Sequence, residues 1–428
     1  MNRRKFMGKT ALGTAAALSS VYIPSYAVNK KLRLGLIGSG WYGMVLMKAA
    51  LKDGNVEVVG ICDVDTEHLE ASSKELMELQ GKAPKKFTDY QELLDQKNLD
   101  AIFIGTQPHW HALQFIDATS KGFPIYCEKP LAYDIREGQA MIKAQEAAGN
   151  IVQIGFQRRQ SQAFQKVKEM ISAGELGKVH QVKAQIHYGA NLKDHTVQEP
   201  PASLDWEAWC GPAPKLQYRP IIGHMAWRLE KEYGNGHLVD WGIHHIDTIR
   251  FIMDEEMPTE YHAMGGIYEF EDKITTPDTL AAQFAFEKAP VMWEHRIWGA
   301  AEYEPSTKNG IFFYGDKATV FASDHRLVVI PNEEDAQPKE IEMRTKDMQE
   351  RHVHEFLNAV RENKQSMVSC TIQDAAKSTA AVQLAMVAYE AGSRIKWDQS
   401  KMEVVNNPDA AKMVMRPYRG DYKHPYQT

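Results

Sequence analysis

The first 155 residues alternate between short apolar runs and amphipathic segments. Apolar runs at 31–37, 99–106 and 151–157 predict buried strands. Further strands are expected within 56–65 and 124–130 and at the start of 85–96. Helices are expected at 44–51, 66–80, 109–121 and 134–149, and at the end of 85–96. Strands that alternate with helices of this length predict a parallel, doubly wound sheet of the Rossmann type.

The second half of the chain has a different pattern, in which apolar and polar residues alternate along single strands. Such runs occur at 178–190, 260–270, 278–287, 290–299, 309–323 and 326–331. They predict a large, open, mainly antiparallel sheet with one face covered and one face wet, and a hairpin around Gly315-Asp316. The predicted fold is therefore an N-terminal α/β Rossmann domain followed by a C-terminal α+β domain.

These patterns divide the chain into four parts. Residues 1–27 are an expected export signal, 32–155 an NAD-binding Rossmann domain and 156–395 a substrate-binding and oligomerisation domain. The last part, 396–428, is a polar tail with several prolines, which we expect to pack on the fold or on a neighbouring subunit. A length of 428 residues agrees with about two domains.

A G-x-G-x-x-G pattern follows the first predicted strand and opens the next helix. Gly38 permits the tight turn, Gly40 lets a pyrophosphate approach the backbone, and Gly43 lets the helix pack close to the strand. Asp63 ends the second predicted strand, where a carboxylate accepts hydrogen bonds from the adenosine ribose and repels a 2′-phosphate. This favours NAD over NADP as the cofactor. The alternative is a glycine-rich turn that binds nothing, with Asp63 as a solvated loop residue.

Cofactors in such folds lie beyond the carboxyl ends of the strands. Several residues occupy these positions in the sequence and are candidate cofactor contacts: Trp41, Tyr42, Thr106, Gln107, His109, Glu128 and Lys129.

Several motifs in this order resemble the Gfo/Idh/MocA oxidoreductases. They are the glycine turn GSGWYG, TQPHWHA at 106–112, YCEKP at 126–130, PPASLDWEAWCGPAP at 200–214, GHLVDWGIHHIDTIRFIM at 236–253 and RHVHEFLNAVREN at 351–363. The resemblance covers residues 32–395. It implies that Lys129 lies near the nicotinamide and that Asp240 and His244 match the family's D-x-x-x-H pair, with the histidine transferring the proton.

The residue types suit this chemistry independently of the resemblance. Histidine titrates near neutral pH and can act as base and then as acid. Lys129 can stabilise a developing alkoxide, and Asp240 and His244 share a face if the segment is helical. The pair has two other interpretations: a surface feature, or a metal half-site completed by His187, His224, His237 or His245. No HExxH motif or cysteine cluster accompanies the pair, so no metal is expected.

The segment from 190 to 235 is rich in Pro, Trp, Tyr and Gly, and we interpret it as part of the wall of a substrate site. Its alternative role is subunit contact or domain packing. The candidate substrate contacts are Arg158, His187, Tyr188, Trp227 and Arg228.

The N-terminus carries Arg3-Arg4, then Phe6 and an Ala-rich run that ends near Ala27, a pattern typical of a twin-arginine export signal. The run is too short and too rich in Ala and Gly for a stable membrane anchor. The alternatives are a disordered basic tail and an ordinary secretory signal. A periplasmic or otherwise exported protein is expected. The net charge of −6 without long runs of one sign gives no indication of nucleic-acid binding.

The four cysteines, Cys62, Cys127, Cys210 and Cys370, are widely spaced, and we expect buried, reduced thiols.

The leading interpretation is an exported NAD-dependent oxidoreductase that acts on a sugar or polyol hydroxyl and forms a homodimer or homotetramer. A second is a glycosidase that oxidises its substrate transiently and recycles the cofactor. A third is a sugar-binding or regulatory protein without catalysis, which the presence of Lys129, Asp240 and His244 disfavours.

Overall fold

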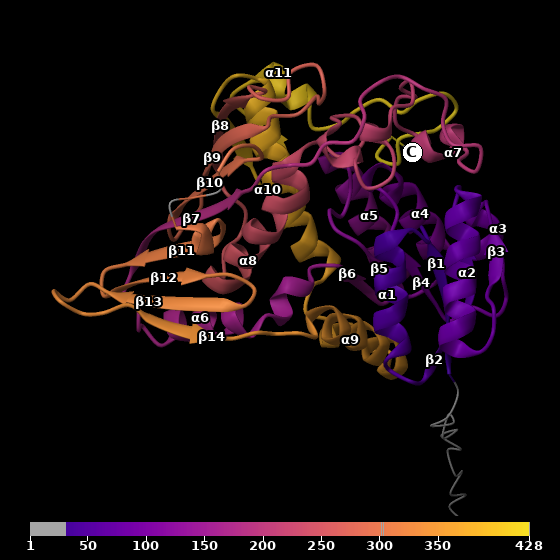
Figure 1. The fold of residues 1–428 in the computed structure, drawn as a ribbon, viewed down its shortest axis with the longest axis horizontal. Coiled ribbons are helices and arrows are strands. Elements are labelled where there is room, and N and C mark those ends of the chain that lie inside the picture. The colour runs from indigo at the N-terminus through magenta and orange to yellow at the C-terminus, as the bar shows by residue number, and fades with distance from the viewer. Residues whose placement is uncertain (1–30, 301, 303, 428) are drawn as a thin grey trace, which may run out of the picture.

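The structure is a computed structural model that describes residues 31–300, 302 and 304–427. The predicted export signal at 1–27 lies outside these residues. Six parallel strands form the sheet of the first domain in the order β3-β2-β1-β4-β5-β6 (Figure 1). They are β1 (Leu32–Ile37), β2 (Val56–Cys62), β3 (Lys85–Phe87), β4 (Ala101–Ile104), β5 (Ile125–Cys127) and β6 (Val152–Ile154). The predicted doubly wound sheet is confirmed.

Helices cover both faces of this sheet. They are α1 (Trp41–Leu51), α2 (Thr66–Gln80), α3 (Tyr90–Leu94), α4 (Pro108–Ser120) and α5 (Ile135–Ala148). Local capping explains several of their ends, because Asp65 caps the first turn of α2 and Asp134 forms a capping box with Glu137 at the start of α5. One apolar cluster joins α1 to one face of the sheet, and a second joins α4 and α5 to the other.

The order of the strands reverses between β1 and β4, which pair directly with each other. The chain continues outward from β1 in one direction and from β4 in the other. A crevice forms at the carboxyl ends of two such strands, and this is where ligands bind in doubly wound sheets.

The second sheet has ten strands in the order β14-β13-β12-β11-β7-β10-β9-β8-β15-β16. They are β7 (Val179–His187), β8 (Glu260–Gly266), β9 (Thr279–Ala285), β10 (Pro290–Arg296), β11 (Asn309–Gly315), β12 (Ala318–Ala322), β13 (Arg326–Pro331), β14 (Lys339–Glu342), β15 (Ile395–Asp398) and β16 (Glu403–Val404). The β7–β10 pair is parallel and the other described pairs are antiparallel. The mainly antiparallel sheet and the hairpin between β11 and β12 agree with the sequence pattern.

One face of this sheet is covered by α6 (Gln162–Ser172), α8 (Ile243–Met253) and α10 (Ile372–Glu390). The alternation along β9 shows the two faces, because Leu280, Ala282 and Phe284 are buried while Ala281 and Gln283 are exposed. The helices and the sheet thus enclose the core of the second domain, and among the described residues the other sheet face is exposed along β9.

Two late segments return to the first domain. Helix α9 (Met348–Glu362) lies beside α1, and its Phe356 and Leu357 join the apolar cluster of that sheet face (Figure 1). The tail begins inside β15, continues through α11 (Pro408–Lys412) and then reaches α5, where His424 Nε2 lies 3.0 Å from Asp134 Oδ2. The tail therefore packs on its own chain.

Within the residues that the structure describes, no helix has both the length and the apolar character needed to span a membrane. The four cysteines are buried and unpaired, as expected from their spacing.

Candidate active site

The glycine loop between β1 and α1 has the close contacts that its sequence predicts. Gly38 has a φ of +86°, and a Cβ there would lie 2.8 Å from the backbone of Gly105 and of Thr106. A Cβ on Gly43 would lie 1.9 Å from the carbonyl oxygen of Gly38. Both positions therefore require glycine, Gly38 for the turn and Gly43 for the packing of α1 against it.

Gly40 has a different environment, because a Cβ there would meet only His68 Nδ1, at 3.6 Å. The backbone at Gly40 is thus open to the space above it, and α1 begins at Trp41 with no side-chain cap on its first N–H groups. Free N–H groups at a helix start, next to a backbone without side chains, bind a pyrophosphate. This donor set fits the dinucleotide that the sequence predicts.

Asp63 lies directly beyond β2, beside the same loop. Its Oδ1 accepts a hydrogen bond from the Asp65 N–H at 3.0 Å, and its Oδ2 accepts one from Ser39 Oγ at 3.4 Å. Burial raises the pKa of this carboxyl, while these hydrogen bonds and the nearby His68 and His224 oppose the rise. The side chain borders the cleft, where ribose hydroxyls would complete its hydrogen bonding.

A cleft of about 1180 Å³ runs from the glycine loop to the second domain. The predicted cofactor residues that line it are Gly38, Gly40, Trp41, Tyr42, Asp63, Thr106, Gln107, Glu128 and Lys129. Gly43 lies behind the loop and acts through packing. The cleft also contains Asp240 and His244 from the second domain, so the structure brings the three predicted catalytic residues into one space with the glycine loop.

Lys129 and Asp240 meet across the two domains. Lys129 Nζ donates to the Asp240 carbonyl oxygen at 2.7 Å and to Asp240 Oδ1 at 3.1 Å. Arg228 Nε lies 3.0 Å from Asp240 Oδ2. Burial alone would raise the pKa of Asp240, but the two cations hold it at about 2. Asp240 is therefore a carboxylate at neutral pH.

The segment that carries Asp240 departs from the expected regular helix. Leu238–Gly242 forms a π-helical turn, in which the Ile243 N–H donates to the Leu238 carbonyl, before α8 begins at Ile243. Such turns occur mostly as single insertions and are frequent at functional sites. The extra residue in this turn changes the direction in which Asp240 leaves the backbone relative to α8.

His244 is the first-turn histidine of α8 that borders the cleft, whereas the neighbouring His245 packs its ring against Trp293. Burial lowers the pKa of His244 well below its usual value, and the cations of Lys129 and Arg158 lower it further. Its Nδ1 has no hydrogen-bond partner among the residues described. The ring is thus neutral near pH 7 and able to accept a proton.

Glu128 directly follows β5, precedes Lys129 and lines the same cleft. Burial raises the pKa of its carboxyl to about 8, although the charge of Lys129 opposes the rise. Its Oε2 accepts from the Lys129 N–H at 3.2 Å, and its buried Oε1 has no partner in the described part of the chain. A protonated Glu128 would be able to donate a hydrogen bond into the cleft.

The candidate substrate residues fall into two groups. Arg158, Trp227 and Arg228 line the cleft. His187 and Tyr188 lie outside it: His187 is paired with Glu302, and the Tyr188 ring packs against His237 with centroids 5.4 Å apart. His187 lies beside Arg296, its register partner on β10, whereas burial and the nearby charge of Asp240 raise the pKa of the Tyr188 hydroxyl.

His109 was expected to contact the cofactor, but its side chain points away from the cleft. The side chain is fully buried on the inner face of α4, where Nε2 lies 3.0 Å from the Trp209 carbonyl oxygen. Burial lowers its pKa to about 3, so it is a neutral residue that joins α4 to the 190–235 segment.

The cleft contains residues that sequence reasoning did not identify. Asp324 pairs with Arg158 at 3.2 Å, and the Arg158 guanidinium lies 4.9 Å from the ring centre of Trp241. Gln157 donates to the Tyr42 hydroxyl at 2.6 Å and so fixes its position. Trp241 lies within the D-x-x-x-H segment, so the motif itself could have indicated that Trp241 lies near the cleft. Asp324 lies in a turn after β12, and no local pattern indicates that it reaches the cleft.

The histidines considered as partners for a metal half-site do not assemble around Asp240 and His244. Among the described residues, neither of these two belongs to a group of three side chains whose donor atoms lie close enough to share an ion. The carboxylate of Asp240 instead forms ion pairs with Lys129 and Arg228.

Comparison with known families gives two matches. Residues 32–156 match the Gfo/Idh/MocA model described as oxidoreductase family, NAD-binding Rossmann fold, and residues 161–424 match the model of its C-terminal alpha/beta domain.

Individual relatives are more distant. The chain is 25% identical to the myo-inositol 2-dehydrogenase of Thermotoga maritima over 298 residues, which cover 69% of this chain and 74% of the relative. It is 28% identical to a glycosyl hydrolase family 109 protein of Stenotrophomonas maltophilia over 179 residues, 40% of this chain and 39% of the relative. The structure of levoglucosan dehydrogenase in complex with NADH and levoglucosan has a TM-score of 0.68 and 17% identity, covering 86% of this chain and 99% of that one. This last likeness shows the shared fold.

Proposed function

The chain belongs to the Gfo/Idh/MocA oxidoreductase family, and we propose that it is an exported enzyme that oxidises a secondary hydroxyl of a sugar or polyol with tightly held NAD. The observation that carries the proposal is the contact between Lys129 and Asp240. The contact supports the proposal because it joins Lys129 to the segment that carries His244, and all three residues border the same cleft as the glycine loop.

The residues of the cleft divide the reaction between them. Bound NAD would supply the hydride acceptor. His244, neutral at pH 7, accepts the hydroxyl proton, and Lys129 stabilises the negative charge that develops on the oxygen. Asp240 orients Lys129 through two contacts. The hydroxyl thus loses its proton to the protein and its carbon loses a hydride, which leaves a ketone.

The choice of NAD over NADP rests on Asp63. A carboxylate at this position accepts hydrogen bonds from ribose hydroxyls and repels a 2′-phosphate. The cations of the described cleft, Lys129, Arg158 and Arg228, belong to the end that holds Asp240, so they do not compensate for a phosphate beside Asp63.

Export is supported by the sequence of residues 1–27, with its paired arginines and small residues near Ala27. A compartment without a free pool of NAD requires that the cofactor leave the cytoplasm with the folded protein. The proposal therefore includes a cofactor that is retained on the enzyme, and repeated oxidation then requires a second, carbonyl-containing substrate that takes the hydride back and regenerates NAD.

Retention favours a second candidate, an NAD-dependent glycosidase, and the relative in glycosyl hydrolase family 109 supports it. In this reaction oxidation of a ring hydroxyl acidifies the neighbouring C–H, and elimination then cleaves the glycosidic bond. Water adds in place of the leaving group, and return of the hydride restores the hydroxyl. Lys129, Asp240 and His244 can serve this sequence equally, because its first step is the same oxidation.

We also propose that the chain assembles as a homodimer or homotetramer through the open face of the ten-stranded sheet. The exposed alternate residues of β9 and the exposed side chain of Met264 on β8 support this arrangement. Size-exclusion chromatography with light scattering tests it directly.

The experiment for the proposed function begins with the purified full chain. The protein is denatured, and any released nucleotide is identified by mass spectrometry. Intact protein is then incubated with a panel of sugars, polyols and glycosides, with and without added NAD. Ketone formation with reduction of the bound or added NAD supports the dehydrogenase, and glycoside cleavage without net NADH supports the glycosidase. Binding of a sugar with neither reaction would contradict both.

A further inference from the structure

A segment of the second domain lies over the end of the cleft that holds Asp63. We call residues 201–224 the adenosine strap. Its first part is joined to the loop after β2 by backbone hydrogen bonds, from the Thr66 N–H to the Ser203 carbonyl at 2.9 Å and from the Asp205 N–H to the Val64 carbonyl at 3.0 Å. Asp65 and Leu204 form an isolated antiparallel bridge between these bonds.

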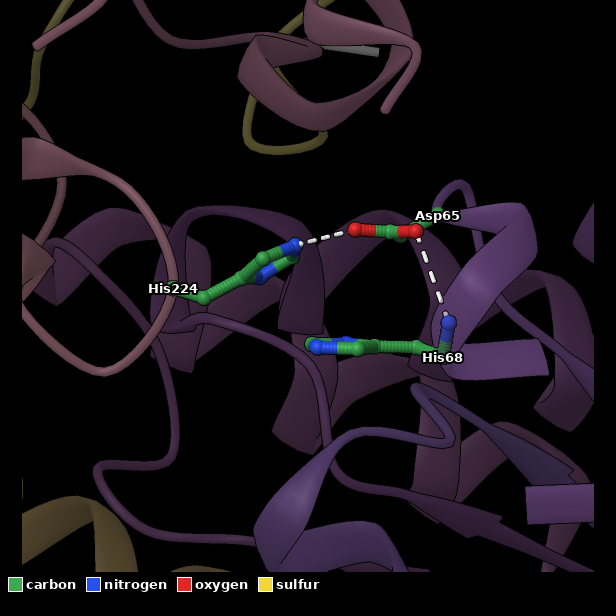
Figure 2. Close-up of side chains that lie close together, drawn as sticks. All are labelled: Asp65, His68 and His224. Carbon is green, nitrogen blue, oxygen red and sulfur yellow. Dashed lines mark hydrogen bonds and ion pairs between the residues drawn. The ribbon is translucent and has the colours of Figure 1, made fainter. Parts of the chain in front are cut away.

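The end of the adenosine strap returns to the same loop through His224. Its Nε2 lies 2.8 Å from Asp65 Oδ2, and its ring lies against the ring of His68 on α2, with centroids 4.2 Å apart (Figure 2). Burial and the nearby His68 lower the pKa of His224, so the neutral ring donates to the carboxylate of Asp65. The strap is therefore fastened to the first domain at both of its ends.

The middle of the adenosine strap is held from outside. Trp206, Trp209 and Ile222 belong to an apolar cluster that also contains Tyr233 and Ile274. Trp110 Nε1 donates to the Ala208 carbonyl at 3.1 Å, and Arg419 of the C-terminal tail donates to the Gly211 carbonyl. Apolar packing and hydrogen bonds from other segments thus hold the strap in place.

Residues of both domains line the end of the cleft that holds Asp63. The strap contributes Ser203, Asp205 and His224, opposite Asp63 and Gly40 of the first domain. A dinucleotide that lies on the glycine loop with its ribose at Asp63 is therefore covered by the second domain.

Asp65, His68 and His224 also bring donor atoms within 4.8 Å of one another, the closeness of a metal-ligand set. Two contacts favour a hydrogen bond between Asp65 and His224 over a metal ion shared by the three side chains. Asp65 Oδ1 caps α2 by accepting from the Glu67 N–H at 2.9 Å. The two imidazole rings lie one over the other with a tilt of 36°, whereas ligands of one tetrahedral ion point toward a common centre.

We propose that the adenosine strap is part of the cofactor site and that His224 is its latch, so that NAD leaves only after the contact between His224 and Asp65 has opened. This inference rests on the proposed function, because it assumes a dinucleotide on the glycine loop. The inference goes beyond the proposed function because it assigns retention of the adenosine half of NAD to residues of the second domain.

The test measures release of bound nucleotide from the full chain, by displacement of fluorescent etheno-NAD with excess NAD. Three variants are compared with the wild type: His224→Ala, His224→Gln, which keeps an N–H donor, and His180→Ala as a control. His180 lies on β7 away from the cleft and its side chain is 57% exposed. Circular dichroism verifies that each variant is folded.

His224→Ala is expected to release the nucleotide about tenfold to a hundredfold faster than the wild type, the effect of losing one hydrogen bond to a charged group. His224→Gln should fall between the two, and His180→Ala should match the wild type. ADP-ribose, which lacks nicotinamide, should show the same loss of affinity as NAD on His224→Ala, and nicotinamide mononucleotide should show none.

Unchanged release from His224→Ala would overturn the latch and leave the proposed function intact. Faster release of wild-type nucleotide after EDTA would overturn it in favour of a metal at Asp65, His68 and His224. Failure of the wild type to bind any nicotinamide dinucleotide would contradict the proposed function itself.

Discussion

Lys129 Nζ lies 2.7 Å from the carbonyl oxygen and 3.1 Å from Oδ1 of Asp240, although the two residues are 111 positions apart in the sequence. Lys129 follows β5 of the first domain, and Asp240 occupies the π-helical turn before α8 of the second. The contact therefore joins the domain that carries the glycine loop to the segment that carries Asp240 and His244.

Replacing Asp240 with Asn should remove the charge that orients Lys129 and Arg228 while keeping the size of the side chain. We expect kcat to fall about a hundredfold, at the lower end of the range for a lost acid–base partner, with little change in NAD affinity. The control is Asp254→Asn at the end of α8, an exposed position with φ of 51°, which Asn also adopts. Equal activity of Asp240→Asn and Asp254→Asn would contradict the role of Asp240.

His244 should determine the acid limb of the pH profile. Because burial and the cations of Lys129 and Arg158 lower its folded pKa below the usual value of 6.5, the ring stays neutral down to a pH below 6.5. Activity in the direction of oxidation should therefore be lost only as pH falls below that value. A kcat profile from pH 4 to 9 measures this, and an acid limb centred above 6.5 would rule out His244 as the base.

His244→Ala provides the matched variant for that profile. We expect a loss of kcat of about a hundredfold to ten-thousandfold and a residual activity without the acid limb. NAD should remain bound, since His244 lies at the opposite end of the cleft from Asp63. His245→Ala is not a suitable control because His245 is packed against Trp293 in the core. His180→Ala, exposed on β7 and away from the cleft, is preferable.

Asp63→Asn should weaken the preference for NAD. The amide keeps an oxygen that accepts from the Asp65 N–H, but it no longer repels a 2′-phosphate. We expect the ratio of Kd for NADP to Kd for NAD to fall by at least about tenfold, because opposed like charges cost several kcal/mol. Isothermal titration with both nucleotides measures the ratio, and an unchanged ratio would remove Asp63 from cofactor selection.

A pair of Gly→Ala variants separates packing at the loop from general helix effects. At Gly43 the new Cβ would lie 1.9 Å from the Gly38 carbonyl, so the backbone must move, and we expect a loss of about 1–3 kcal/mol in the free energy of unfolding together with weaker NAD binding. At Gly138 in α5 the nearest atom would be 3.8 Å away, and alanine should stabilise by about 0.5–1 kcal/mol. Urea unfolding distinguishes the two, and similar effects at both sites would be inconsistent with this geometry.

The sequence was most informative where function depends on neighbours along the chain. The glycine loop, Asp63 and the strand ends are set by local turn and strand patterns, so their positions at the cleft follow from the order of strands and helices. His109 was misplaced because residues along the first turn of α4 point in different directions, and no pattern shows which of them faces the cleft.

Other parts of the site depend on contacts between distant segments. Asp324 meets Arg158 from a turn after β12, and His224 meets Asp65 across 159 positions. A short-range pattern carries no information about such pairs. The family motifs identified Asp240 and His244, but the π-helical turn that carries Asp240 has no hydrophobic periodicity by which it differs from an ordinary helix.

The position of bound NAD in a crystal structure of the full chain tests the central claim most directly. We predict that the pyrophosphate lies on the backbone at Gly40, that the adenosine ribose contacts Asp63, and that the nicotinamide ring lies beside Lys129 and His244. A dinucleotide bound elsewhere, or with its nicotinamide turned away from Lys129, would contradict the account.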